Sequence, residues 1–224
     1  MTAILHDAAD TSGLVAGTLV VLVAAGWLAR GLARTGAGLG AANAVTLTRA
    51  CLVAVVTGFV VRALLAGTPV ARTVVAVAAV ALALDAVDGL VARTTGSATA
   101  LGARFDWEVD AFLMLVLSAL LARDVAGWVL AIGLMRYVFV VVGTALPWLL
   151  APLPPRYSRK VVAAVQGVVL VAAASGLLPA PAPVLLLGAA LASLSWSFGL
   201  DVVRLARTRP GRTGAPEPVL VASR

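Results

Sequence analysis

Apolar residues dominate seven long stretches of the chain, and polar residues gather in the short joints between them. Each stretch has about the twenty residues that a helix needs to cross the roughly 30 Å hydrocarbon core of a bilayer. Glycine and proline in the joints, as in Gly67-Thr68-Pro69, are typical helix breakers. The pattern predicts transmembrane helices at Gly13–Ala33, Ala44–Ala66, Arg72–Thr94, Gly102–Ala122, Val125–Leu146, Lys160–Leu177 and Pro183–Ala206.

These helices divide the chain into four parts. We expect an extracytoplasmic segment over residues 1–12, a first transmembrane helix over 13–34, a membrane domain over 43–207 and a disordered cytoplasmic tail over 208–224. Acidic residues precede the first helix and Arg30 and Arg34 end it, which is opposite to the charge order of a secretory signal. The first helix is therefore expected to be retained.

The composition supports the bilayer as solvent. The chain is 62% hydrophobic and only 12% charged, whereas a soluble domain carries roughly 25% charged residues. The net charge of +7 would suggest nucleic acid in a soluble protein. Here the bases flank apolar stretches, which favours lipid headgroups and no nucleic-acid partner. Cys51, the single cysteine, is expected to be a small buried apolar residue.

The bases are distributed unequally between the two sides that alternating helices create. Only Arg62, Arg72 and Arg123 lie near one side. By the positive-inside rule the richer side is cytoplasmic, which predicts a multi-pass protein of the cell (inner or plasma) membrane. The cytoplasmic bases are Arg30, Arg34, Arg93, Arg104, Arg156, Arg159, Lys160, Arg204, Arg207, Arg209, Arg212 and Arg224.

Four aspartates interrupt the third and fourth stretches. An ionisable side chain at the bilayer centre costs roughly 2.5–3.5 kcal/mol even on lenient insertion scales, so these groups need a polar cavity, a cation or an interfacial position. Asp85 and Asp88 are three residues apart, and Asp106 and Asp110 are four apart, so each pair shares one helix face. Antiparallel packing of the two helices would bring all four carboxylates together.

Carboxylates crowded in this way need a compensating cation. Oxygen-only ligands favour magnesium, manganese or calcium over zinc. Gly89 and Gly102 allow close approach of a ligand or backbone, and the planar fork of Arg93 suits a diphosphate. Singly, each feature has a structural explanation: an Asp–Arg packing pair, helix-packing glycines, or an interfacial ion pair between Arg104 and Glu108. Together they indicate phosphoryl-group chemistry.

The same residues form an extended pattern with fixed gaps. Residues 85–110 read D-A-V-D-G-L-V-A-R, eight residues, and then G-A-R-F-D-W-E-V-D. This resembles the signature of the class I CDP-alcohol phosphatidyltransferase family, D-x2-D-G-x2-A-R-x8-G-x3-D-x3-D. Upstream, residues 43–49 resemble the N-x2-T-x2-R start of the family's first core helix. The matching positions are Asp85, Asp88, Gly89, Ala92, Arg93, Gly102, Asp106 and Asp110, with Asn43, Thr46 and Arg49 upstream.

The resemblance implies an all-α polytopic transmembrane bundle of six core helices, to which this chain adds one N-terminal hydrophobic helix. It also implies a homodimer whose site opens to the cytoplasmic leaflet, and transfer from a CDP-diacylglycerol-type lipid to a small alcohol with release of CMP. Asp85, Asp88 and Asp106 would hold Mg²⁺ or Mn²⁺, and Asp110 would be the general base and a further metal contact. The CDP-lipid site would include Asn43, Thr46, Gly89, Ala92, Arg93 and Gly102.

The acceptor is less closely defined. Arg136, Arg159 and Lys160 could bind a phosphorylated polyol such as glycerol 3-phosphate or inositol phosphate, whereas topology-setting charge is the alternative and is favoured for Arg156. Gln166 is either a hydrogen-bonding helper or a contact between helices. Cardiolipin-type synthesis on phosphatidylglycerol also stays open. Outside this class, the alternatives are a cation or proton transporter that uses the aspartates, and a non-catalytic family member.

Overall fold

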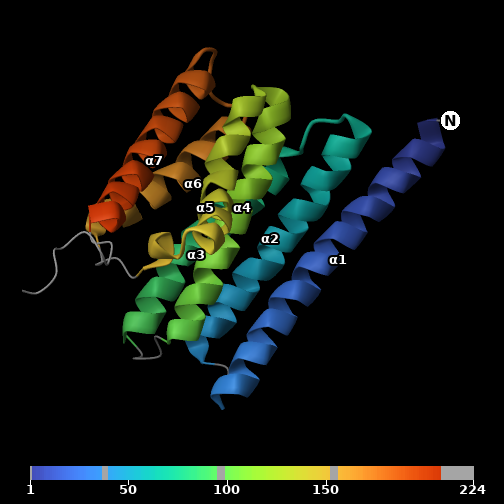
Figure 1. The fold of residues 1–224 in the computed structure, drawn as a ribbon. Coiled ribbons are helices and arrows are strands. Elements are labelled where there is room, and N and C mark those ends of the chain that lie inside the picture. The colour runs from blue at the N-terminus through green and yellow to red at the C-terminus, as the bar shows by residue number, and fades with distance from the viewer. Residues whose placement is uncertain (1, 37–39, 95–98, 152–155, 208–224) are drawn as a thin grey trace, which may run out of the picture.

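A bundle of long α-helices makes up the computed structural model of the chain (Figure 1). The structure describes residues 2–36, 40–94, 99–151 and 156–207, and of residues 2–6, 41, 42, 86 and 88–94 only the backbone. Within these ranges there are helices and no strands. The helices are α1 Thr2–Thr35, α2 Ala41–Ala66, α3 Arg72–Thr94, α4 Ala100–Asp124, α5 Leu130–Ala145, α6 Tyr157–Ala174 and α7 Ala182–Arg207, with short 3-10 turns η1 Gly127–Val129 and η2 Pro147–Leu150.

The predicted all-α polytopic bundle is confirmed. Five of the described helices are long and apolar enough to cross a membrane: α1, α2, α6, α7, and α5 together with η1. α4 carries too many charged residues to qualify by composition, and much of α3 has only its backbone described. Large apolar side chains point outward on several helices, among them Leu22, Val141 and Trp196. These features indicate a multi-pass membrane protein.

The start of the first helix differs from that expected from hydropathy. α1 begins at Thr2, so residues 2–12 continue the first helix as one rod instead of preceding it. The tail over 208–224 lies outside the described residues.

Cys51 is exposed on α2, so the prediction that it is buried was wrong. An apolar sequence context does not distinguish a side that faces another helix from one that faces lipid.

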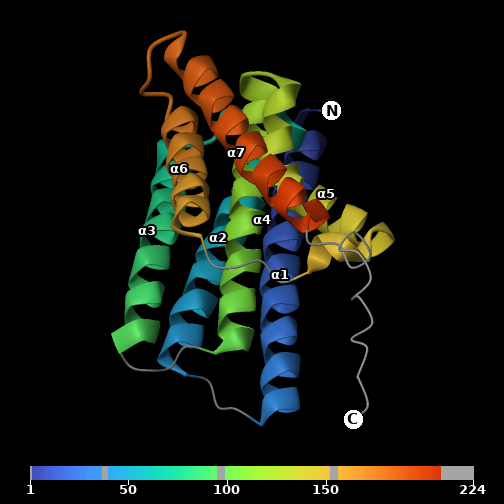
Figure 2. The ribbon, with the colours of Figure 1, turned by 60° about the vertical axis from the view of Figure 1, so that its left-hand side comes forward.

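α4 lies at the centre of the bundle. It packs against α1, α2, α3, α5 and α6, and nine of its side chains are buried. Its first turn is fixed by Thr99, whose hydroxyl accepts a 3.0 Å hydrogen bond from the backbone N–H of Gly102. In Figure 1, α7 and α1 lie at opposite sides of the bundle, and Figure 2 shows that α7 crosses the other helices obliquely. Side chains on α4 are therefore held by neighbours on several sides.

The added helix α1 lies along α2 through a contact between glycines (Figure 1). A Cβ atom placed on Gly13 would lie 2.5 Å from the carbonyl oxygen of Gly58, and one on Gly58 would lie 2.8 Å from that of Gly13. Arg62 on α2 also pairs with Asp10 on α1. Small residues at such seams let helix backbones approach closely in membranes, so α1 is a packed part of the bundle.

We expect Gly13→Ala to lower the melting temperature in detergent by roughly 3–10 °C, because the added methyl overpacks against the α2 backbone at about 1–3 kcal/mol. Gly26→Ala on the same helix is the matched control, since a Cβ atom there meets nothing within 4 Å. The melting temperatures of both variants are measured by size-exclusion chromatography after heating. Equal melting temperatures would show that the glycine contact does not hold α1 in place.

Candidate active site

The carboxylates of α3 and α4 meet where these helices face α2. Asp85 projects from α3, and Asp106 and Asp110 project from successive turns of α4. One oxygen of each lies within 4.8 Å of the other two. The predicted meeting of the two pairs is thus present for three of the four aspartates. Asp88 lies on the next turn of α3, and its side chain lies outside the described residues.

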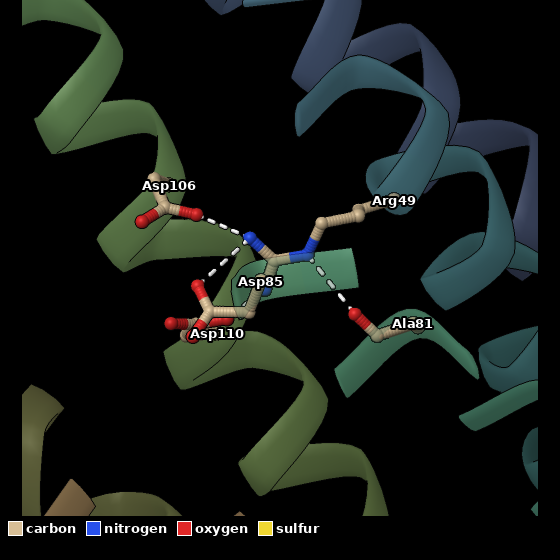
Figure 3. Close-up of polar contacts among 5 residues, drawn as sticks. All are labelled: Arg49, Ala81, Asp85, Asp106 and Asp110. Atoms are coloured by element: carbon tan, nitrogen blue, oxygen red, sulfur yellow. Dashed lines mark hydrogen bonds and ion pairs between the residues drawn. The ribbon is translucent and has the colours of Figure 1, made fainter. Parts of the chain in front are cut away.

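Arg49 of α2 lies among these three carboxylates (Figure 3). Its Nη1 forms ion pairs with Asp85 at 3.1 Å and with Asp106, and its Nη2 pairs with Asp110. Its Nε donates a 3.0 Å hydrogen bond to the backbone carbonyl of Ala81 on α3. The side chain is only 1% exposed. A single guanidinium, with five donors in a rigid plane, therefore connects three helices.

Electrostatic magnitudes show why a cation is needed there. At 4.8 Å and an effective dielectric of about 20, two carboxylates repel by about 3.5 kcal/mol, so three pairs give on the order of 10 kcal/mol. One guanidinium near all three offsets about 4 kcal/mol for each at roughly 4 Å. These three attractions, on the order of 12 kcal/mol together, are as large as the mutual repulsion, so Arg49 can offset it. In formal charges, three carboxylates and one arginine still leave two negative charges.

Asn43 and Thr46 precede Arg49 by two turns and one turn of α2. All three side chains are buried, and their spacing places them along one side of the helix. A Cβ atom on Gly102 would lie 2.6 Å from Oδ1 of Asn43, so a larger residue at the start of α4 would force the Asn43 side chain to move. The upstream motif and the downstream motif therefore lie against each other in space.

Three further predicted site residues cannot be placed by side chain. Gly89, Ala92 and Arg93 belong to the last turns of α3, where the structure describes only the backbone. Their assignment to the CDP-lipid site stays a prediction.

The basic residues predicted for the acceptor pair with different acids. Arg136 on α5 pairs with Glu108 on α4, whereas the four-residue spacing predicted Arg104 as the partner of Glu108. Arg159 on α6 pairs with Asp201 on α7 at 3.1 Å, and Lys160 beside it is exposed. Arg136 therefore belongs to the contact between α4 and α5, and Arg159 to that between α6 and α7. Whether any of them binds an acceptor stays a prediction.

Asp201 was not singled out from the sequence, yet it is buried at 7% exposure. Arg156 reaches it at 3.8 Å and also donates a 3.1 Å hydrogen bond to the hydroxyl of Ser197. Two arginines at the start of α6 thus share one carboxylate near the end of α7. In the sequence, Asp201 can be recognised as an acid inside an apolar stretch. No local pattern indicates which residues it pairs with.

Gln166 continues the same interface. It is fully buried, and its Nε2 donates hydrogen bonds to the carbonyl of Ala190 at 2.9 Å and to the hydroxyl of Ser193 at 3.2 Å. Of the two roles considered for Gln166, these bonds support the contact between helices.

The family model for CDP-alcohol phosphatidyltransferase matches residues 39–200, and the chain belongs to this family. Searches of curated proteins and of solved structures gave no significant match. The match begins after α1, so the first helix lies outside it. The family supports transfer of a phosphatidyl group from a CDP-alcohol, and therefore a transferase acting on phospholipids.

Members of the family generally use a divalent metal with an aspartate cluster. The residues present fit such an ion. Asp85, Asp106 and Asp110 offer only carboxylate oxygens, the donors that Mg²⁺ and Mn²⁺ prefer, within 4.8 Å of one another. Counted over these three carboxylates alone, Arg49 leaves a negative formal charge, which a divalent cation would neutralise.

We expect Asp201→Asn to destabilise the protein by about 3 kcal/mol, because it leaves two partly buried arginines without a countercharge. The melting temperature should fall by roughly 6–12 °C. Asp10→Asn removes an ion pair whose partners are 49% and 45% exposed, and should change it by less than about 3 °C. A loss for Asp201→Asn no larger than this control would mean that the α6–α7 cluster adds little to stability.

Proposed function

We propose that the protein transfers the phosphatidyl group of CDP-diacylglycerol, or a closely similar CDP-linked lipid, to a phosphorylated polyol such as glycerol 3-phosphate or inositol phosphate, and releases CMP. The observation that carries this proposal is the convergence of Asp85, Asp106 and Asp110 within 4.8 Å at the spacing of the family signature. The active site would open to the cytoplasmic leaflet of the cell membrane, in a homodimer.

Asp110 is assigned the role of general base. It accepts the proton of the acceptor hydroxyl, whose oxygen attacks the lipid-side phosphorus as the bond from that phosphorus to the CMP oxygen breaks. A carboxylate has two oxygens, and the contact with Arg49 uses Oδ1. Proton transfer through Oδ2 is therefore compatible with the ion pair.

The other site residues bind and orient the substrate. Asp85, Asp88 and Asp106, with Asp110, would hold Mg²⁺ or Mn²⁺, which when bound supplies positive charge for the diphosphate and the leaving CMP. Arg93 is assigned to the diphosphate because its planar fork matches phosphate oxygens. Gly89, Ala92 and Gly102, with Asn43 and Thr46, are assigned to the cytidine diphosphate. The burial of Asn43 against Gly102 supports this for the start of α4.

The reaction is tested by CMP release from CDP-diacylglycerol, with purified protein, Mg²⁺ and a mixture of alcohols. We expect Asp110→Asn to reduce turnover by about 10²- to 10⁴-fold, the usual contribution of a general base. EDTA should abolish release, and added Mg²⁺ or Mn²⁺ should restore it. Asp124→Asn is the matched control on α4, because Asp124 pairs with its exposed neighbour Arg123, and it should retain activity. Full turnover in Asp110→Asn would refute the base assignment.

The acceptor is identified by screening alcohols with labelled CDP-diacylglycerol and determining the molecular mass of the lipid product. We expect a phosphorylated polyol to react and Lys160→Gln to raise its KM at least fivefold, with kcat within twofold, because Lys160 is exposed beside Arg159 at the start of α6. Arg207→Gln, which removes an exposed charge at the end of α7, should leave KM unchanged. A product formed only from phosphatidylglycerol would instead identify cardiolipin-type synthesis.

A further inference from the structure

Among the described side chains, the three carboxylates that pair with Arg49 are also the candidate ligands of a divalent cation. The guanidinium pairs with Asp85, Asp106 and Asp110, and these are the residues whose oxygens lie close enough together to hold a metal ion. A cation bound among those oxygens shares them with the Nη1 and Nη2 groups of Arg49, and like charges at close range repel. The positive charge of Arg49 therefore opposes metal binding, whereas its contacts favour metal binding by keeping the three carboxylates close together.

The Nε contact of Arg49 differs from its ion pairs with Asp85, Asp106 and Asp110. It goes to the backbone carbonyl of Ala81, which is not a metal-binding candidate, at 3.0 Å. This bond, together with burial at 1% exposure, holds the side chain beside the carboxylates even when they turn toward another cation. Arg49 is thus placed to act on the site continuously and not as an exposed counterion that can swing away.

We propose that Arg49 is a positioning residue that holds the three carboxylates together across α2, α3 and α4 and competes with the divalent metal for their oxygens, so that it lowers and sets the metal affinity of the site. This inference rests on the metal site of the proposed function. It goes beyond that function because it assigns the guanidinium of Arg49 to the site as a permanent positive charge. It predicts tighter metal binding, not weaker, when a substitution removes that charge.

The proposal is tested by titrating Mn²⁺ into purified protein in detergent, without lipid substrate, and measuring free Mn²⁺ by electron paramagnetic resonance. We expect Arg49→Gln to lower the dissociation constant for Mn²⁺ at least tenfold. In EDTA the same variant should melt at a lower temperature than the wild type, because the carboxylates repel without Arg49, and Mn²⁺ should restore more of its stability than it adds to the wild type. A purely structural role would weaken Mn²⁺ binding together with stability.

Arg62→Gln is the matched control. It removes an arginine of the same helix that pairs with Asp10 on α1, and its Mn²⁺ affinity should stay within twofold of the wild type. If Arg49→Gln is too unstable to purify, Arg49→Lys serves in its place. One ammonium group cannot cover three carboxylates as a planar fork does, so Mn²⁺ affinity should rise about threefold.

An affinity equal to or below that of the wild type, in whichever Arg49 variant is purified, overturns the proposal. If the wild type binds Mn²⁺ and the variants gain nothing, only the role of Arg49 fails. If the wild type itself binds no Mn²⁺, both this inference and the metal assignment of the proposed function fail. CMP release, measured separately, then decides whether the transfer reaction remains.

Discussion

The guanidinium of Arg49 lies among three carboxylates that come from two other helices, and this contact joins α2, α3 and α4 at one point (Figure 3). Acids at this separation repel strongly in a medium of low dielectric. Arg49 is buried and the three carboxylates are partly buried, and such an ion cluster seldom adds much net stability over a well-packed apolar core, because desolvation offsets the attraction. We therefore regard the contact chiefly as a constraint on geometry, which gives the carboxylates one arrangement relative to each other.

That constraint depends on a rigid frame. α4 supplies two of the three acids and is packed by neighbouring helices on several sides, so Asp106 and Asp110 cannot drift independently. At its start, Gly102 lets Asn43 of α2 approach, and Thr99 fixes the first turn. Gly102, which belongs to the motif over residues 85–110, thus leaves room for Asn43 of the motif over residues 43–49. The absence of a side chain at this position lets two motifs that are far apart in the chain pack against each other.

Contacts away from the acidic cluster hold the outer helices of the bundle. α1 precedes the matched region and is joined to α2 by the contact between Gly13 and Gly58. At the other side of the bundle, Asp201 and Gln166 connect α6 to α7 through ion pairs and hydrogen bonds. In a bilayer, apolar surfaces do not drive helices together as they do in water, so close packing and polar contacts decide which helices are neighbours.

Local patterns along the chain were enough to predict the class of fold, the family and the acidic motif. Length and apolarity of a stretch are local properties, and the predicted segment Arg72–Thr94 has the same bounds as α3. Spacing within one helix also predicted that Asp106 and Asp110 share a face.

Contacts between helices were decided only by the tertiary structure. Arg49 meets Asp106 and Asp110 across 57 and 61 residues, Glu108 pairs with Arg136 on another helix, and Asp201 lies 42 residues from Arg159. Cys51 faces outward from an apolar stretch for the same reason. Which side of a helix is covered, and by which partner, depends on how helices distant in the chain rotate and pack against one another, and no local pattern of residues encodes that rotation.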